Sequence, residues 1–332
     1  MASIRQIRSR LRSTQSTKQI MRAMQLVSAS KLKRAQGRLY QARAMLEFLD
    51  GLLDRVLAST PDLTHPLTSP REGASVLVVF TSDAGLAGAY NTNLIHLAES
   101  YLRRDSAKRT QVVYIGKKGH RYFTKRGWPA LDSYVDLAGR PNLARAEEIG
   151  RALMSRFLAA GPATGGTSSP TGTSSAAGMV PPPRHAKHVR DSVPEIAPRF
   201  QGARSAGGVS DVQLLFSQFV SSSVYRPTIL KWLPVTLSAQ PQPSRARTDY
   251  IFEPSPERVF EDLLPRWALV KFQLVMLEAF TSEHSARMIA MKNATDNAEE
   301  LLRALTMQRN KIRQASITKE LSEIVGTAEA LK

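Results

Sequence analysis

The fold is decided by residues 4–56, which read IRQIRSRLRSTQSTKQIMRAMQLVSASKLKRAQGRLYQARAMLEFLDGLLDRV. Positions alternately three and four residues apart form a stripe, and 12 of its 16 members are apolar. An apolar repeat kept over this length is typical of a coiled-coil helix, and no proline precedes Pro61. At 1.5 Å per residue the pattern predicts one helix of about 80 Å. The stripe consists of Ile4, Ile7, Leu11, Thr14, Lys18, Met21, Gln25, Ser28, Leu32, Ala35, Leu39, Ala42, Leu46, Leu49, Leu53 and Val56.

A second stripe of the same period follows Pro265, after which the chain has no further proline and only one glycine, Gly326. Two terminal helices joined by a compact domain can pair only by returning along each other, so we expect a long antiparallel coiled coil. The predicted parts are a helix over 1–58, a domain over 59–257 and a helix over 258–332. We expect looser packing where polar residues interrupt the two stripes, at Thr14, Lys18, Gln25 and Ser28 in the first and at Thr281, His284, Thr295 and Arg309 in the second. The second stripe consists of Trp267, Val270, Leu274, Leu277, Thr281, His284, Met288, Met291, Thr295, Ala298, Leu302, Leu305, Arg309 and Ile312.

The middle of the chain alternates between strand-like and helix-like segments, which favours an open, mainly parallel α/β sheet. One segment, 161–208, is rich in Gly, Ser, Thr, Pro and Ala and has no apolar period, so we interpret it as a flexible insertion. Strands are expected at 76–80, 111–115, 133–137, 211–219 and 225–235, and helices at 92–104, 117–126 and 144–160.

The charge is strongly basic and unevenly placed. The net charge is +18, and residues 1–46 hold 11 Lys or Arg and no Asp or Glu. Three interpretations of this basic helix are open: nucleic-acid binding, a mitochondrial presequence, and a protein partner with an acidic lining. Aromatic side chains that could stack on bases are restricted to Tyr40 and Phe48, which disfavours nucleic acid. The absence of cysteine excludes disulfides and thiol redox control.

No pattern of catalytic or cofactor-binding residues emerges. The loop at 81–91 places glycines between a strand and a helix, but its spacing is neither GxGxxG nor GxxxxGK[ST]. We therefore favour tight packing there, with Asp83 or Asn91 as a cap, over a nucleotide site. His185 and His188 lie three residues apart without a cysteine or carboxylate between them, which disfavours a metal site. Residues 268–280, the longest apolar run, are too short to span a membrane, which takes about 20 residues.

Both ends of the chain resemble one family. Residues 7–32 are similar to the N-terminal helix of the γ subunit of F-type ATP synthases, and SEHSARMIAMKNATDN at 282–297 with NKIRQASITKEL at 310–321 resembles its C-terminal helix. The loop TSDAGLAG at 81–88 resembles the family's (S/T)-D-R-G-L-C/A-G, with Ala84 in place of the basic residue. DYIFEP at 249–254 resembles the family's W-D-Y-x-Y-E-P.

The resemblance implies a central shaft of two helices inside a ring of three α and three β subunits. The middle part would be a Rossmann-like domain that binds no nucleotide and rests near the membrane ring of c subunits. The implied partners are α, β, ε and the c-ring, with no nucleic acid, no cofactor, and membrane contact only through partners. The implied location is the cytoplasmic face of a bacterial inner membrane. Because the family pattern starts by Ile4, a presequence has no room.

The resemblance also assigns contact residues. Arg313, Gln314 and Thr318 match a cluster that binds a loop of β, and Met24 matches the facing position on the N-terminal helix. Tyr250 and Glu253 would contact ε or the c-ring, with Arg43 nearby. A structural coiled-coil adaptor is the alternative from another class, and a nucleotide-dependent enzyme ranks third. The role of 161–208, the coupling ion, the preferred direction and the c-ring size stay open.

Overall fold

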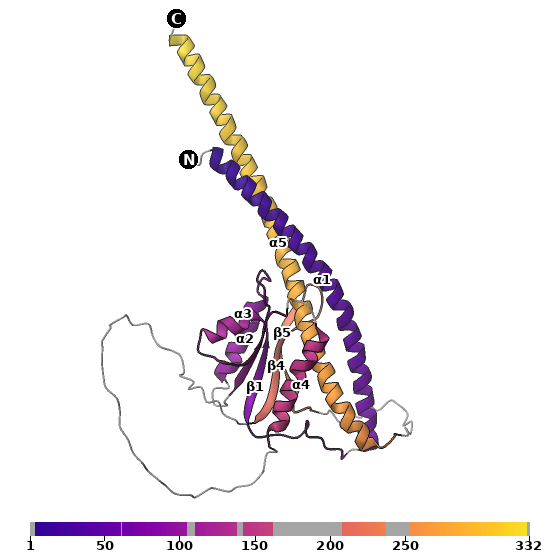
Figure 1. Cartoon of the computed structure of the whole chain (residues 1–332). Coiled ribbons are helices and arrows are strands. Elements are labelled where there is room, and N and C mark those ends of the chain that lie inside the picture. The colour runs from indigo at the N-terminus through magenta and orange to yellow at the C-terminus, as the bar shows by residue number, and fades with distance from the viewer. Residues whose placement is uncertain are drawn as a thin grey trace, which may run out of the picture.

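The computed structural model describes residues 4–60, 62–104, 110–137, 142–161, 208–236 and 252–330. It consists of a long rod of two helices with a small α/β domain against its lower half (Figure 1). The elements in chain order are α1 (Ile4–Ser59), β1 (Ala74–Phe80), α2 (Tyr90–Arg104), β2 (Gln111–Ile115), α3 (Lys117–Thr124), β3 (Ala130–Tyr134), α4 (Leu143–Ala159), β4 (Val209–Phe219), β5 (Tyr225–Leu233) and α5 (Pro256–Ala330).

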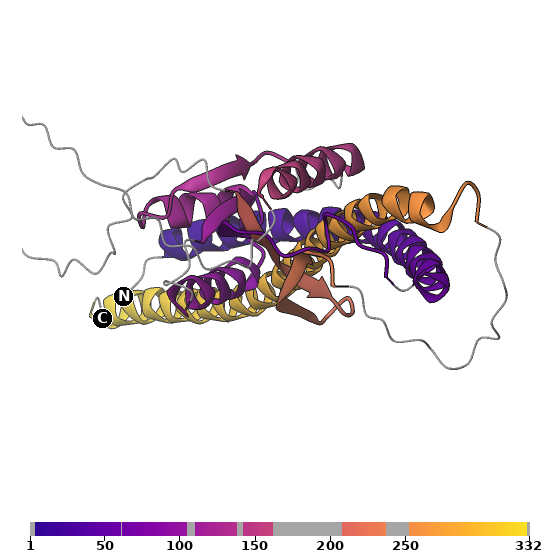
Figure 2. The ribbon, with the colours of Figure 1, turned by 90° about the horizontal axis from the view of Figure 1, so that it is seen from below.

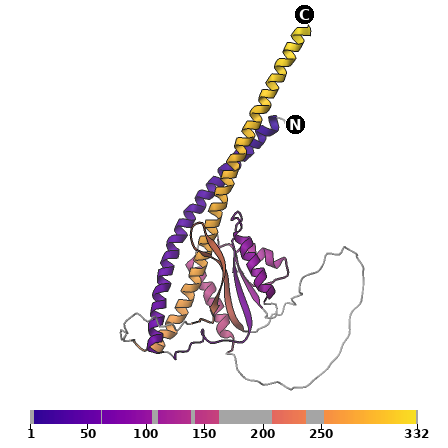
Figure 3. The same ribbon diagram turned by 180° about the vertical axis from the view of Figure 1, so that it is seen from behind.

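The rod is an antiparallel pair of α1 and α5, as the two stripes predicted. Both described helix ends nearest the chain termini lie at the same end of the molecule (Figures 1 and 3). Side-chain contacts fix the register, since Lys18 pairs with Glu299 at 3.2 Å and Arg43 with Glu278 at 2.8 Å. Every member of either stripe whose side chain is described is buried or half-buried. The predicted seam is therefore confirmed.

The two helices differ in length, so α5 extends past the start of α1. Helix α1 has 56 residues and α5 has 75. From Arg313 to Thr327 every side chain except the half-buried Ser316 is exposed. This last part of α5 has no partner helix among the described residues. We call residues 313–327 the free end of α5.

The five strands form one sheet in the order β3-β2-β1-β4-β5. All neighbouring pairs are parallel except β4 with the edge strand β5. Strand β1 lies in the centre and is a nearly continuous apolar run, as expected for a strand covered on both faces. Val76, Val78 and Phe80 face α4 and α5, whereas Leu77 and Val79 face α2 and α3. The prediction of an open, mainly parallel sheet is confirmed.

The third strand lies three residues earlier than the sequence predicted, at Ala130–Tyr134 rather than 133–137. The chain leaves the sheet after Tyr134 because Asp136 adopts a left-handed backbone with φ 61°. Its backbone N–H donates to the Asp83 carboxylate at 3.2 Å, far away in sequence. A long-range bond, invisible to a local pattern, therefore ends this strand.

One stretch of α5 is enclosed on all sides. All fourteen residues from Leu274 to Arg287 are buried. Leu274 and Leu277 pack against α1, whereas Val275 and Met276 pack into the core formed by the sheet and α4. Helix α5 thus lies alongside both α1 and the sheet (Figure 2). We call residues 274–287 the hub, because they join the rod to the α/β domain.

Residues 162–207 lie outside the described residues, but the two points where the chain enters and leaves this segment adjoin. A Cβ placed on Gly208 would meet the backbone and side chain of Ala160 within 2.5 Å. Gly208 is itself fixed, since its carbonyl accepts from Ala74 N at 2.9 Å. The domain therefore closes without needing the segment to span any gap.

We expect the domain to fold without that segment. A variant in which two glycines replace residues 162–207 should unfold in urea at a midpoint close to that of the full chain, because shortening a long loop lowers the closure cost only slowly. Circular dichroism and urea titration of the purified chains measure this. A variant without a cooperative transition would show that the segment belongs to the core.

Burial of the hub predicts a large loss of stability on truncation. Leu277→Ala should lower the free energy of unfolding by about 2–5 kcal/mol, since the side chain is 1% exposed and leaves a cavity. Leu301→Ala, at a position 50% exposed on the same helix, should cost less than about 0.5 kcal/mol. Equal shifts of the two urea midpoints would contradict the enclosed arrangement.

Candidate functional site

The free end of α5 carries the residues that the sequence assigned to a contact with β. Arg313, Gln314 and Thr318 are all exposed. The Thr318 hydroxyl donates to the Gln314 carbonyl at 3.0 Å, within the helix. Within the described part of the chain, the side chains of Arg313 and Gln314 make no hydrogen bond. Their polar groups are therefore available to a partner, and the Arg fork can hold a carboxylate by two parallel bonds.

Apolar side chains share this end, a feature that the sequence analysis missed. Ile317, Leu321, Ile324 and Val325 are between 48% and 63% exposed. Their spacing places them along one side of the helix, but not in line with the stripe that ends at Ile312, because Ile317 follows Ile312 after five residues. The signal in the sequence is a separate short repeat of four and three residues, from Ile317 through Leu321 to Ile324. Contiguous uncovered apolar surface of this kind marks a protein interface.

Met24 does not lie opposite this cluster, so that expectation is wrong. The half-buried Met24 lies between Lys18 and Arg43, whose partners are Glu299 and Glu278. It therefore faces α5 between those two glutamates. Arg313 lies fourteen residues beyond Glu299, about 21 Å along the helix axis. The overhang of α5 causes the mismatch.

A shallow basic groove of about 620 Å³ runs between α1 and α5 below the free end. Its lining includes five cationic side chains and no carboxylate. It occupies the stretch where Thr14 and Lys18 interrupt the seam, which agrees with the looser packing expected there. The same expectation is wrong at Ser28, Thr281, His284 and Thr295, which are all buried. Among the described residues, Arg8, Arg12 and Arg22 have no hydrogen-bond or ion-pair partner. The lining residues are Arg8, Leu11, Arg12, Gln15, Lys18, Gln19, Arg22, Leu302, Thr306 and Arg309.

Arg43 is engaged inside the molecule rather than near Glu253, where the sequence analysis expected it. Its guanidinium donates to the Glu278 carboxylate at 2.8 Å and to the Phe219 carbonyl at 2.9 Å, and so joins α1, α5 and β4. Burial raises the pKa of Glu278, and the nearby Arg43 opposes that shift. The side chain of Arg43 is 33% exposed, which leaves one edge open to solvent.

Arg43 and Glu253, two of the residues expected to meet ε or the c-ring at what we call the foot of the shaft, lie far apart. Glu253 is exposed just before α5, beside a small pocket of about 270 Å³ that also includes Arg258 and Asp262. Arg43 is level with Glu278, about 33 Å along α5 from its first residue. The expectation that Arg43 lies near Glu253 is therefore wrong. Tyr250 lies outside the described residues, whereas Phe252 is half-buried against the core.

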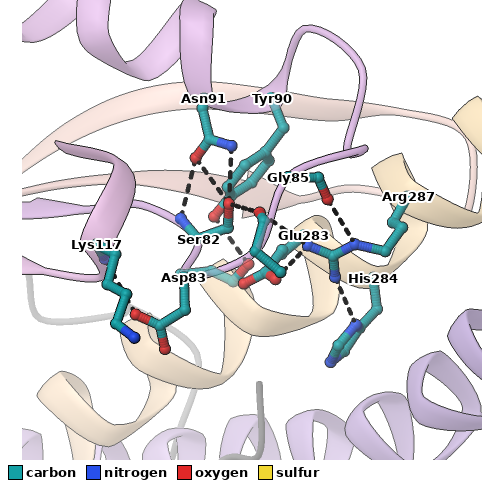
Figure 4. A network of polar contacts seen from close by, with 11 residues as sticks. Ser82, Asp83, Gly85, Tyr90, Asn91, Lys117, Glu283, His284 and Arg287 are labelled. Carbon is teal, nitrogen blue, oxygen red and sulfur yellow. Dashed lines mark hydrogen bonds and ion pairs between the residues drawn. The ribbon is translucent and has the colours of Figure 1, made fainter. Parts of the chain in front are cut away.

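The glycine loop after β1 is filled from within the chain (Figure 4). The Asp83 carboxylate accepts from Lys117 N, the first N–H of α3, at 3.0 Å. Asn91 Oδ1 accepts from Ser82 N at 3.0 Å. The carbonyls of Ala84 and Gly85 accept from the Arg287 guanidinium. The Asp83 carboxylate and the carbonyls of Ala84 and Gly85 are thus already paired within the chain, which supports tight packing over a nucleotide site.

The described residues form neither a metal site nor a membrane span. No group of three or more His, Cys, Asp or Glu is arranged in this part of the chain so as to hold a metal ion. No helix among the described ranges has a run long and apolar enough to cross a lipid bilayer.

Known proteins of one family match this chain over nearly its full length. The family model described as ATP synthase matches residues 3–331. An ATP synthase gamma chain from Moorella thermoacetica is 35% identical over 333 residues and covers 100% of both chains. One from Anaeromyxobacter dehalogenans is 35% identical over 337 residues, again covering 100% of both. One from Frankia casuarinae is 34% identical over 334 residues, covering 99% of this chain and 97% of the relative.

Solved structures share the fold. A chain of the Euglena gracilis mitochondrial ATP synthase, in the OSCP/F1/c-ring structure of rotational state 3, aligns with a TM-score of 0.59 at 17% identity, covering 99% of this chain and 94% of that one. A chain of the Tetrahymena thermophila central stalk and c-ring aligns with a TM-score of 0.51 at 18% identity, covering 83% and 99%. Together with the full-length match at about one third identity, the rod and its attached sheet establish that the chain belongs to the ATP synthase gamma chain family.

Proposed function

We propose that this chain is the central rotor shaft of an F-type ATP synthase. It couples rotation of a c-ring, driven by protons or another ion, to ATP synthesis or hydrolysis at the β subunits. The observation that carries the proposal is the rod itself: a two-helix shaft bound to a sheet domain at one end and bare at the other, within a full-length family match. The partners are the α and β ring, ε and the c-ring.

The bare end is suited to turn inside a ring of subunits. The apolar stripe of the free end needs a covering surface, which a collar of surrounding subunits supplies. Arg313 and Gln314 break the symmetry of the shaft, because they project from one helix only. As the shaft turns, one β subunit after another meets them. Such bonds must form and break in each cycle, so each is expected to contribute only about 1–3 kcal/mol.

The basic groove extends this contact down the shaft. Arg8, Arg12 and Arg22 lie on one side of α1 at helical spacing and have no partner in the described part of the chain. Their positive charge favours binding to acidic loops of the surrounding subunits. It also orients the shaft as it enters the ring of α and β subunits during assembly.

The foot of the shaft is proposed to meet ε and the c-ring. Glu253 is exposed beside the start of α5, and Tyr250 belongs to the same sequence motif. The chain supplies no catalytic residue of its own in this proposal. It is a peripheral subunit on the cytoplasmic face of a bacterial inner membrane, held there through its partners.

Co-purification tests the proposal as a whole. The tagged chain should bring down α and β subunits in threefold excess over itself, together with ATPase activity. Recovery of the chain alone, or with a stoichiometric partner that has no ATPase activity, would favour a coiled-coil adaptor instead.

We expect the double variant Arg313→Ala, Gln314→Ala to slow ATP turnover of the assembled complex several-fold while the fold is unchanged. Both side chains are exposed and unbonded within the described residues, so the chain loses only partner contacts. Lys319→Ala, an exposed change on the same free end, is the control and should leave turnover within twofold. Wild-type turnover and coupling in the double variant would remove these residues from the mechanism.

The groove predicts a charge-dependent assembly rate. Arg8→Gln, Arg12→Gln and Arg22→Gln combined should slow association with α and β about tenfold at low salt and weaken its salt dependence. The control triple Arg103→Gln, Arg121→Gln and Lys125→Gln removes the same charge from exposed positions on the α/β domain. If both triples slow assembly equally, net charge rather than the groove steers the shaft.

A further inference from the structure

The hub occupies the place where open α/β sheets bind their ligands. In the order β3-β2-β1-β4-β5 the chain runs outward from β1 in one direction and resumes at β4 in the other, so the switch point lies between β1 and β4. Ligands of such sheets bind in the crevice outside the carboxyl ends of these strands. Here side chains of α5 contact both ends. Arg287 reaches the loop after β1, and Ser282 Oγ donates to Ser217 O of β4 at 2.9 Å.

Arg287 occupies this crevice and makes four polar contacts there. Its Nη2 donates to Glu283 Oε1 at 2.7 Å and to the Ala84 carbonyl at 3.3 Å, and its Nε donates to the Gly85 carbonyl at 3.2 Å. Its Nη1 lies 3.4 Å from His284 Nδ1. The Arg287 and Glu283 side chains are only 9% and 5% exposed. Figure 4 shows the guanidinium between α5 and the loop, with Glu283 beside it.

The loop that Arg287 holds needs an anchor. Leu86, at its tip, adopts a left-handed backbone with φ 62° and is 60% exposed, so its own side chain does not fix it. A non-glycine residue in this region persists only where its surroundings hold it. Arg287 holds the two residues directly before Leu86. On the far side, Asn91 and Asp83 tie the loop to α2 and α3.

Directional bonds resist turning in a way that apolar packing does not. Apolar contacts keep α5 against the sheet but are non-directional, so they oppose slippage about the helix axis weakly. Hydrogen bonds weaken steeply when their angle changes. The hub carries several of them to different elements, including Tyr90 OH to the Ala279 carbonyl at 3.0 Å and Ser285 Oγ to the Ser222 carbonyl.

We propose that the buried Glu283–Arg287 pair is a torque-bearing joint, in which the guanidinium of α5 takes the ligand's place at the switch point and fixes the α/β domain against rotation about the shaft. The inference rests on the proposed rotor function. Arg287 and Glu283 are positioning residues: they touch no substrate, and they act by transmitting the rotation of the foot to the free end.

The geometry demands arginine at this position. Three acceptors surround the guanidinium, namely one carboxylate and two carbonyls, and a planar fork of donors can serve them together. Lysine carries the same charge as a single point and cannot bridge α5 and the loop in the same way. Arg287→Lys therefore keeps the ion pair with Glu283 and loses the joint. Arg303→Lys is the matched control, since Arg303 pairs with Glu299 at the same spacing on the exposed side of α5.

Hydrogen exchange on the purified full chain tests the joint without any partner. In Arg287→Lys the amides of residues 81–91 should exchange at least tenfold faster than in the wild type, and in Arg303→Lys they should not change. Unchanged exchange in Arg287→Lys would overturn the proposal. If Arg287→Lys does not fold, Glu283→Gln replaces it. That variant keeps the fork but weakens its charged anchor, and exchange should rise about threefold.

The assembled complex tests torque. In membrane vesicles, ATP-driven proton pumping per ATP hydrolysed should fall at least threefold in Arg287→Lys, with hydrolysis by the soluble α, β and shaft subcomplex kept within twofold. A merely structural role would lower both together. A normal pumping ratio despite faster loop exchange would overturn the torque role. Failure of the wild-type chain to assemble with α and β would instead reject the proposed function, and the exchange result would stand apart from it.

Discussion

Enclosure of the hub on all sides is the constraint on which the rest of the structure depends. A helix between α1 and a sheet has no face left for water, so its polar residues each need a partner inside the protein. Thr281 donates back to the Leu277 carbonyl at 2.7 Å, Ser282 to β4, and Arg287 to the loop after β1. The bond of Thr281 stays within α5, whereas those of Ser282 and Arg287 fix the rod and the domain in one arrangement. A rod that only touched the sheet could not carry rotation from one to the other.

The paired helices could be predicted because a stripe of period 3.5 is a local property of the sequence. Their register could not, since antiparallel stripes fit together at several offsets of seven residues. The offset is chosen by contacts such as Lys18 with Glu299 and the Trp267 ring N–H with Asp50 at 2.6 Å. That choice leaves α5 overhanging. It explains why Met24 lies far from Arg313, and why Arg43 meets Glu278 rather than the foot.

In the sheet, too, features set by the local sequence could be predicted and features set by distant residues could not. Strands β1 and β2 are nearly continuous apolar runs and β4 contains the apolar run 214–216, so propensity identifies all three to within two residues. Strand β3 lies three residues earlier than predicted because both 130–134 and 133–137 fit a strand pattern. The hydrogen bond from Asp136 N to the Asp83 carboxylate decides between the two positions. The loop at 81–91 was expected to be packed rather than ligand-binding. The residue that fills it, Arg287, lies some two hundred positions away and carries no local sign of this contact.

The free end of α5 is a lone helix whose order depends on what surrounds it. Isolated helices of about 12–15 residues are marginal in water. Side-chain pairs within this helix stabilise it only weakly. Lys319 pairs with Glu323 at 3.6 Å and Ser316 with Glu320 at 3.1 Å, and such pairs contribute about 0.2–0.5 kcal/mol each to helix stability. A partner that covers Ile317, Leu321 and Ile324 removes their apolar surface from water, and this burial stabilises the helix by more than the side-chain pairs do. Assembly and helix formation at the free end are therefore linked. A ring of subunits that binds the helical form of residues 313–327 also stabilises that form.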